Sequence, residues 1–186
     1  MKTFDKYEKR GSYHYSWYEK NTFHYKDHVD KILSYLSDKG SVLDIGCGDG
    51  LISHKLHAKG HSVVGVDTNE LAIKYAKEKC DLITARRSKI LFVNKSIYNM
   101  NMGITYSYVI CHDVLEHLPN PEEAIQIMYE VCNKFCIITT PDANVFKPSA
   151  YDNKLWNKEG IVKLFRDYKY EYVNLFDTFF IKLIKS

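Results

Sequence analysis

The stretch VLDIGCGDG, from Val42 to Gly50, decides which fold the sequence predicts. An apolar run typical of a buried strand leads into a turn that carries glycine at positions 46, 48 and 50. Glycines lack the side chains that would keep a ligand away from the backbone, and a helix that starts after the turn offers free N–H groups to that ligand. We therefore expect a strand, a ligand-binding turn and a helix in succession.

The remainder of the chain alternates short apolar runs with helical periodicity from residue 29 onward, which is typical of a βαβ succession. Strands are expected at residues 41–45, 62–66, 90–94, 106–111 and 135–140, and helices near residues 50–58, 69–79, 121–132 and after 156. Two further strands are expected around Asn174 to Thr178, and they must pair antiparallel because a parallel crossover needs about a dozen residues. The sequence therefore predicts an α/β protein with a Rossmann-like, seven-stranded, mostly parallel sheet, an antiparallel last strand and helices on both faces.

The composition excludes several classes of protein. A net charge of +3 with intermixed Lys and Glu does not favour nucleic acid as a partner. Five cysteines form an odd set without a regular framework, and no apolar run at the N-terminus resembles a signal peptide, so we expect a cytoplasmic protein. No stretch reaches the ~20 consecutive apolar residues that a membrane span requires, so no membrane partner is expected.

Two acidic residues accompany the glycine turn. Asp67 closes the next strand, VVGVD, 21 residues after Gly46, where a carboxylate can accept both hydroxyls of a ribose. Asp44 precedes the first glycine, which gives D-x-G-x-G-x-G instead of G-x-G-x-x-G and disfavours a nicotinamide-dependent oxidoreductase. On these residues, the chain from about residue 25 to 186 resembles the class I S-adenosylmethionine-dependent methyltransferases.

The resemblance implies S-adenosylmethionine as the methyl donor, and it implies a set of residues that bind the donor. These residues are Asp44, Gly46, Cys47, Gly48, Asp67, Thr68, Ser96 and His112. Asp44 and the Gly46–Gly48 backbone would hold the methionine part, Asp67 the ribose, and Thr68 would lie near the adenine. The family often has an acid after the third strand to bind the adenine amino group, and this chain has Ser96 instead.

The segment HDVLEH, from His112 to His117, supplies the candidate catalytic residues. If it is helical, Asp113, Glu116 and His117 share one face. In one interpretation Leu115 and Leu118 pack inward while the acids and the histidine face solvent. In a second, His117 is a general base that Asp113 or Glu116 orients. In a third, Asp113, Glu116 and His117 bind Mg or Mn, which carboxylates and imidazole can ligate.

The same segment resembles two groups within the methyltransferases. It is similar to the E-x-x-E-H pattern of metal-dependent RNA 3'-end 2'-O-methyltransferases and to ubiquinone-pathway O-methyltransferases. For the RNA enzymes the resemblance implies a further histidine after the fifth strand. The chain has no histidine after His117, which counts against an RNA acceptor.

The first 25 residues are rich in aromatic side chains. They include Phe4, Tyr7, Tyr13, Tyr15, Trp17, Tyr18, Phe23 and Tyr25. We expect residues 1–25 to form a lid over donor and acceptor, with a packed extension or a homodimer contact as alternatives, and residues 26–186 to form a single methyltransferase domain. The connection from Pro141 to Trp156 is a second candidate lid.

The sequence thus predicts an enzyme that methylates an oxygen of a small acceptor. The acceptor is expected to be a small metabolite or a sugar derivative, such as a surface-polysaccharide precursor or a quinone-type intermediate, and polysaccharide biosynthesis is the expected pathway. One alternative is a metal-dependent enzyme of the RNA 3'-end type. The other is a regulatory module that binds S-adenosylmethionine without transferring its methyl group.

Overall fold

Residues 5–83 and 90–185 are described by the computed structural model of the chain. The chain divides into two units, an N-terminal unit that ends at Ser96 and a C-terminal unit from Ile97 onward. Each unit contains its own strands and helices. Residues 5–25 belong to the same unit as the glycine turn, and the proposed division between residues 25 and 26 stays a prediction.

Three parallel strands form the sheet of the N-terminal unit, in the order β3-β2-β1. They are β1 (Ser41–Ile45), β2 (Ser62–Asp67) and β3 (Leu91–Asn94). Ser41 pairs with Ser62 and Val64 pairs with Leu91. Because the strands run in the same direction, Ile45, Asp67 and Asn94 end at one edge of the sheet. The glycine turn leaves the sheet at this edge.

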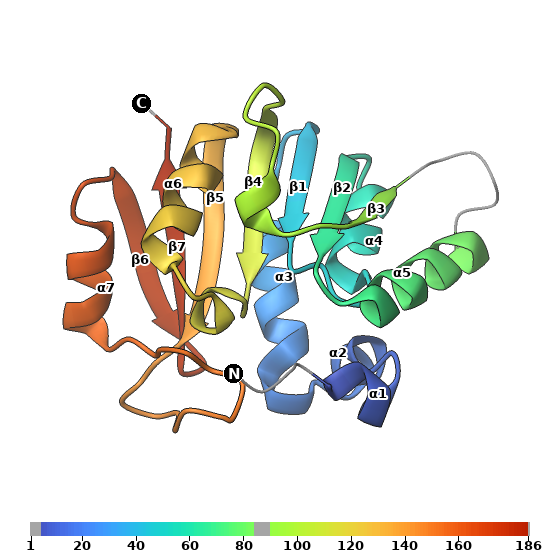
Figure 1. Cartoon of the computed structure of the whole chain (residues 1–186), viewed down its shortest axis with the longest axis horizontal. Coiled ribbons are helices and arrows are strands. Elements are labelled where there is room, and N and C mark those ends of the chain that lie inside the picture. The colour runs from blue at the N-terminus through green and yellow to red at the C-terminus, as the bar shows by residue number, and fades with distance from the viewer. Residues whose placement is uncertain (1–4, 84–89, 186) are drawn as a thin grey trace. The chain divides into compact units, whose positions relative to one another are not determined.

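The helices of the N-terminal unit surround these strands. They are α1 (Lys6–Arg10), α2 (His14–Lys20), η1 (Thr22–His24), α3 (Tyr25–Tyr35), α4 (Leu51–Ala58) and α5 (Glu70–Ile83). Helix α4 starts directly after Gly50 and packs on β2, while α5 packs on β2 and β3. Figure 1 shows α1 and α2 at the edge where β1 and β2 end. The N-terminal helices therefore lie beside the glycine turn.

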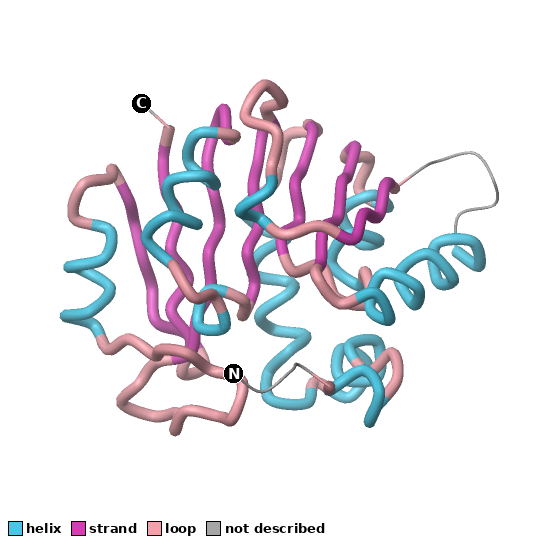
Figure 2. Tube along the Cα trace, in the orientation of Figure 1, coloured by secondary structure: helices cyan, strands magenta, loops and turns pink. Residues whose placement is uncertain are grey.

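The C-terminal unit has four strands in the order β4-β5-β7-β6. Its elements are η2 (Ile97–Asn99), β4 (Tyr106–His112), η3 (Leu115–His117), α6 (Pro121–Glu130), β5 (Cys132–Pro141), α7 (Lys158–Phe165), β6 (Tyr170–Leu175) and β7 (Thr178–Ile184). Strands β4 and β5 are parallel, and β7 is antiparallel to both β5 and β6. Phe176 and Asp177 join β6 to β7 with φ angles of 53° and 62°, as a tight hairpin turn requires. In Figure 2, the long loop between β5 and α7 lies at the edge where β4 and β5 end.

The predicted fold class is confirmed. The N-terminal unit contributes three parallel strands and the C-terminal unit four, of which β7 is antiparallel to its neighbours, with helices flanking the strands of each unit. One boundary was predicted wrongly, because the helix before β5 ends at Glu130 and the strand starts at Cys132 instead of residue 135. A register shift opposite Tyr106 and Tyr108 allows Cys132 to pair with Tyr106, and the apolar pattern does not reveal such a shift.

All five cysteines are free thiols and are buried. Among the described residues, no helix has the length and apolar character needed to cross a membrane.

Candidate active site

The glycine turn adopts a backbone that glycine favours. Gly46, Gly48 and Gly50 have φ angles of 66°, 56° and 84°, in the left-handed region that residues with a side chain rarely occupy. At Gly48 space is limiting as well, because an added Cβ would lie 2.9 Å from Cε1 of His14 and would collide with the hydroxyl of Tyr7. The turn is therefore shaped both by its own backbone and by the N-terminal segment that lies on it.

Asp44 is buried below the turn. Only 2% of the residue is exposed, and the Ser53 hydroxyl of α4 donates a hydrogen bond of 2.6 Å to its Oδ2. Burial raises the pKa of Asp44 to about 7, although the bond from Ser53 favours the ionised form. This carboxyl group thus changes charge near neutral pH. Ser53 was not predicted, and its only sequence signal is its position in the first turn of the helix after Gly50.

Asp67 connects the end of β2 to the glycine turn. Its Oδ2 accepts a hydrogen bond of 3.0 Å from the Gly48 N–H, and its Oδ1 accepts one of 2.8 Å from the Asn69 N–H. Burial raises the pKa of Asp67, while these two bonds oppose the shift. Thr68 follows and is exposed. The structure therefore brings Asp67 to the turn, as the sequence predicted.

The residues expected near the adenine, Thr68 and Ser96, follow the ends of β2 and β3. Asn94, the last residue of β3, donates a hydrogen bond of 3.0 Å from Nδ2 to the carbonyl oxygen of Asp67, so the ends of β2 and β3 are joined. Ser96 follows two residues later and is half-buried. The roles of Thr68 and Ser96 toward adenine stay predictions.

Asp49 anchors the N-terminal segment to the glycine turn. The residue is fully buried, and its carboxylate accepts hydrogen bonds of 3.0 Å from the Ser12 hydroxyl, the His14 N–H and Nδ1 of His14. Burial opposes ionisation, but the charge interaction with His14 and these hydrogen bonds outweigh it and lower the pKa of Asp49. Sequence reasoning missed this residue, since nothing nearby in the chain indicates its partners.

Aromatic rings complete the N-terminal segment. Tyr7 stacks on Tyr13 with 5.2 Å between ring centroids, Tyr13 lies 4.7 Å from Trp17, and His14 stacks on Tyr25 at 5.2 Å. Tyr7 and Tyr13 are buried. The predicted aromatic segment thus packs onto the unit that holds the glycine turn, and its roles as a lid or a homodimer contact stay predictions.

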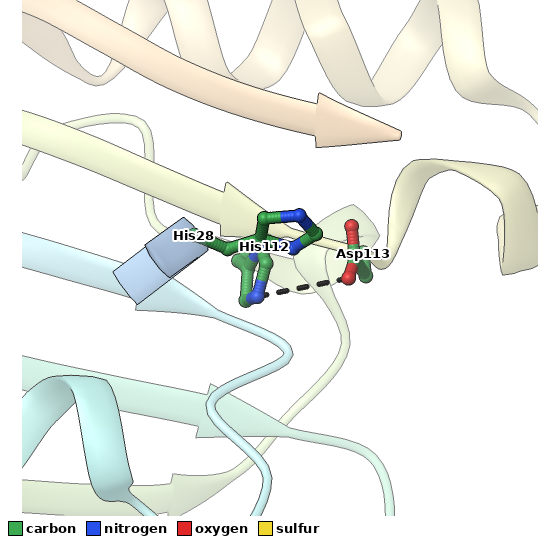
Figure 3. A group of neighbouring side chains, drawn as sticks. All are labelled: His28, His112 and Asp113. Atoms are coloured by element: carbon green, nitrogen blue, oxygen red, sulfur yellow. Dashed lines mark ion pairs between the residues drawn. The ribbon is translucent and has the colours of Figure 1, made fainter. Parts of the chain in front are cut away.

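In the C-terminal unit, Thr139 of β5 joins the first two residues of HDVLEH. Its hydroxyl donates a hydrogen bond of 2.9 Å to Oδ1 of Asp113, and it lies 2.7 Å from Nδ1 of His112 and 3.0 Å from the Asp113 N–H. Figure 3 shows His112 and Asp113, whose Nε2 and Oδ2 atoms are 3.6 Å apart; His28, also drawn, belongs to α3. Asp113 has a φ angle of 51°, a strained conformation of the kind found at functional sites.

Glu116 is buried, which corrects one of the predictions. Only 2% of the residue is exposed, and the Thr140 hydroxyl donates a hydrogen bond of 3.3 Å to Oε2. Burial, and then the nearby charge of Asp113, raise the pKa of Glu116 well above its usual value. The surroundings of this carboxyl group therefore favour its protonated form. Leu115 packs inward as predicted, but the expectation that both acids face solvent is wrong.

His117 pairs with the long loop after β5. Its Nδ1 lies 3.0 Å from Oδ1 of Asp152 and 3.2 Å from the carbonyl oxygen of Tyr151, while Nε2 lies 3.9 Å from Oε1 of Glu116. Asn153 donates a hydrogen bond of 2.7 Å from Nδ2 to the His117 carbonyl oxygen. Sequence reasoning named Asp113 and Glu116 as the orienting acids and missed Asp152.

The segment also differs from the predicted α-helix. The positive φ angle at Asp113 turns the chain, and only Leu115–His117 form a short 3₁₀ helix. The shared face of positions i, i+3 and i+4 is therefore absent. Within residues 5–83 and 90–185, Asp113, Glu116 and His117 do not bring one ligand atom each within 4.8 Å of one another. The geometry does not support the predicted Mg or Mn site.

The strands and the glycine turn together define a Rossmann-like protein that binds a nucleoside-containing ligand. A family model described as a methyltransferase domain matches residues 18–179. The chain therefore belongs to the methyltransferase domain family and has the Rossmann-like fold of class I S-adenosylmethionine-dependent methyltransferases. The oxidoreductase alternative is excluded by this assignment.

Named relatives include O-methyltransferases of ubiquinone biosynthesis. The one from Nitrosomonas europaea is 34% identical over 106 residues, which are 54% of this chain and 42% of the relative. The mitochondrial one from Schizosaccharomyces pombe is 32% identical over 89 residues, 48% of this chain and 32% of the relative. The chain thus spans less than half the length of these relatives. They give no support to a sugar or surface-polysaccharide precursor as acceptor, and the expected place in polysaccharide biosynthesis is withdrawn.

Solved structures agree on the fold. Magnesium protoporphyrin IX methyltransferase from Synechocystis PCC 6803, solved with bound S-adenosylmethionine, has a TM-score of 0.73 and 21% identity. The similarity covers 88% of this chain and 80% of that one. Asp67 fits this donor, because it lies at the end of β2 beside the glycine turn, where a carboxylate can accept hydrogen bonds from ribose hydroxyls.

Proposed function

We propose that the chain transfers a methyl group from S-adenosylmethionine to a hydroxyl oxygen of a small aromatic acceptor of the quinone-pathway type. The proposal rests on one observation, the hydrogen bond from the Gly48 N–H to the carboxylate of Asp67 at the glycine turn. Relatives named as ubiquinone biosynthesis O-methyltransferases support oxygen as the methylated atom. When bound, S-adenosylmethionine supplies a methyl group on a positively charged sulfur that an oxygen nucleophile can attack.

Different residues of the N-terminal unit would bind different parts of the donor. Asp67 would accept hydrogen bonds from the ribose hydroxyls, and a charge-assisted bond of this kind contributes roughly 1.5 to 3 kcal/mol. Asp44 and the backbone of Gly46 to Gly48 would hold the methionine part. The ionised form of Asp44 favours a positively charged donor, so donor binding should couple to the charge of this carboxyl group.

His117 is our candidate for the proton acceptor in the C-terminal unit. Its Nδ1 is paired with Asp152, which would orient the imidazole to take a proton from an acceptor hydroxyl. The oxygen would then form its bond to the methyl carbon as the bond between carbon and sulfur breaks, and the proton would stay on His117. A general base in this position contributes roughly 100-fold to 10,000-fold to the rate. The raised pKa of Glu116 favours its protonated form, which would donate a hydrogen bond to an acceptor oxygen.

The loop after β5 is our candidate for contacts with the acceptor. It carries the exposed apolar side chains of Val145 and Phe146, 55% and 40% exposed, seven and six residues before Asp152 in the sequence. Exposed apolar side chains suit a ligand with an aromatic ring. No metal enters the proposal, because Asp113, Glu116 and His117 do not converge.

The proposal is tested with the purified chain. We expect calorimetry to show binding of S-adenosylhomocysteine and no binding of NAD. We also expect methyl transfer from labelled S-adenosylmethionine to 3,4-dihydroxybenzoate, unchanged after exhaustive chelation. Absence of donor binding would overturn the proposal. Donor binding without transfer to any phenol would support the regulatory alternative, and loss of activity on chelation would restore the metal-dependent one.

A further inference from the structure

The N-terminal segment lies directly on the glycine turn of its own unit. The Tyr7 hydroxyl and Cε1 of His14 both occupy the space next to the Gly48 Cα, where an added Cβ would meet them. Gly48 is in turn hydrogen-bonded to Asp67. The two side chains therefore stand at the part of the turn that the proposed function gives to the donor.

We propose that Tyr7 and His14 contact the donor itself, and that Asp49 is the positioning residue that holds them there. The proposal rests on the proposed function, since the ligand in question is S-adenosylmethionine or its demethylated product. It assigns residues 7–14 to the donor site. The segment had been expected only to cover the site.

Asp49 explains why the segment stays in place. Its carboxylate has no exposed surface, and three of its hydrogen bonds come from Ser12 and His14. A buried carboxylate without such partners would be strongly unfavourable. The conformation of the glycine turn that buries Asp49 therefore requires the N-terminal segment. Formation of the donor site and docking of the segment become one event.

The chemistry of the two side chains suits the polar methionine end or the ribose of the donor. Burial, and then the neighbouring Tyr13 and Asp67, raise the pKa of Tyr7 well above its usual value, so its hydroxyl stays a hydrogen-bond donor. Nδ1 of His14 is held by Asp49, and in the described part of the chain its Nε2 has no protein hydrogen-bond partner. One ring edge is thus fixed, and the other is available to a ligand.

Calorimetry of the full chain with S-adenosylhomocysteine tests the assignment. Removing a hydrogen bond to a ligand typically lowers affinity by roughly threefold to tenfold, so we expect losses of this size in Tyr7→Phe and His14→Gln. Asp49→Asn should lose roughly tenfold or more, because it frees the segment as well. His24→Gln is the matched control, because His24 also pairs with an aspartate, Asp27, at 3.2 Å but on the exposed side of the segment. The control should bind within twofold of the parent chain.

A second readout covers the case in which Asp49→Asn fails to fold. Tyr7→Phe removes a single oxygen, and Trp17, 5.9 Å from the His14 ring, reports on the site by its fluorescence. We expect S-adenosylhomocysteine to change the Trp17 emission in a Trp156→Phe background. Folded Tyr7→Phe and His14→Gln proteins that bind as well as the control would overturn this assignment alone. A parent chain that binds neither S-adenosylmethionine nor its product would overturn the proposed function together with it.

Discussion

The two units build their polar sites in different ways. In the N-terminal unit, Gly48 bonds to Asp67, 19 residues further along, and Asp67 can be recognised because it closes the strand that follows the glycine turn. In the C-terminal unit, Glu116 and His117 bond to Thr140 and Asp152, which lie 24 and 35 residues further along the chain and belong to no motif. A partner whose position a motif fixes can be recognised in the sequence, whereas a partner without a motif cannot.

The neighbouring charges of the acids differ as well. Asp49 is fully buried and yet has a lowered pKa, because the charge interaction with His14 and the hydrogen bonds from His14 and Ser12 outweigh burial. Glu116 is also buried and has a raised pKa, because the nearby charge of Asp113 adds to the effect of burial and the bond from Thr140 does not offset them. Burial alone therefore does not decide the direction of a pKa shift, and the sign of the neighbouring charges and the hydrogen bonds contribute to it.

The largest expected effect is on turnover in the C-terminal unit. His117→Ala should lower kcat by roughly 100-fold to 10,000-fold, because the proton acceptor is lost. Asp152→Asn should lower kcat in the same direction by a smaller factor, while Asp167→Asn, 82% exposed at the side chain, should not. Steady-state kinetics with 3,4-dihydroxybenzoate and labelled donor measure these effects. Normal turnover of His117→Ala would assign the proton acceptor to another residue.

The next effect is on donor binding in the N-terminal unit. Asp67→Ala should weaken the binding of S-adenosylmethionine by roughly 1.5 to 3 kcal/mol, because the ribose hydroxyls lose a charged hydrogen-bond partner. Titration calorimetry gives this value directly, and circular dichroism checks that the variant is folded. Asp38→Ala, at an exposed position after α3, serves as the control. Equal affinities of the two variants would remove Asp67 from the donor site.

A smaller effect concerns pH and Asp44. Its pKa is about 7 in the folded chain, so the carboxylate that favours a cationic donor forms as pH rises from 6 to 8. The affinity for S-adenosylmethionine should therefore increase by several-fold over this interval, and Asp44→Asn should abolish the increase. Calorimetry at three pH values measures it. An identical pH dependence in Asp44→Asn would show that another group titrates.

The smallest effect concerns the stability of the C-terminal unit. Because the pKa of Glu116 is raised in the fold, the folded chain holds its proton more tightly, and this contribution is lost as pH rises from about 4.5 toward the folded pKa. Glu116→Gln keeps the shape without an ionisable group, so its melting temperature should fall less between pH 5 and pH 8 than that of the parent chain. Glu123→Gln, at an exposed position of α6, should behave like the parent. Parallel melting curves of Glu116→Gln and the parent would contradict the raised pKa.

The sequence predicted the strands and the glycine turn because their signals are local. Apolar runs, glycine spacing and the terminal acid Asp67 can all be recognised without knowing the fold. The path of HDVLEH could not be predicted, since the positive φ angle at Asp113 depends on hydrogen bonds to Thr139 of a neighbouring strand. The aromatic content of residues 1–25 was evident, but its attachment through Asp49 required the folded structure.

One part of the loop after β5 is hydrogen-bonded to Glu116, and the other part is exposed, so the two parts tolerate different changes of sequence. The N–H groups of Asn153 and Lys154 bond to the Glu116 carbonyl oxygen at 2.7 and 3.2 Å, and the Ser149 N–H bonds to the Asp152 carboxylate, whereas residues 143–148 are all exposed. Substitutions within residues 143–148 can therefore accumulate while Ser149 still holds Asp152 beside His117. Descendants of one ancestral enzyme could exchange acceptors along this stretch, and a directed library confined to it would explore new acceptors without endangering the chemistry.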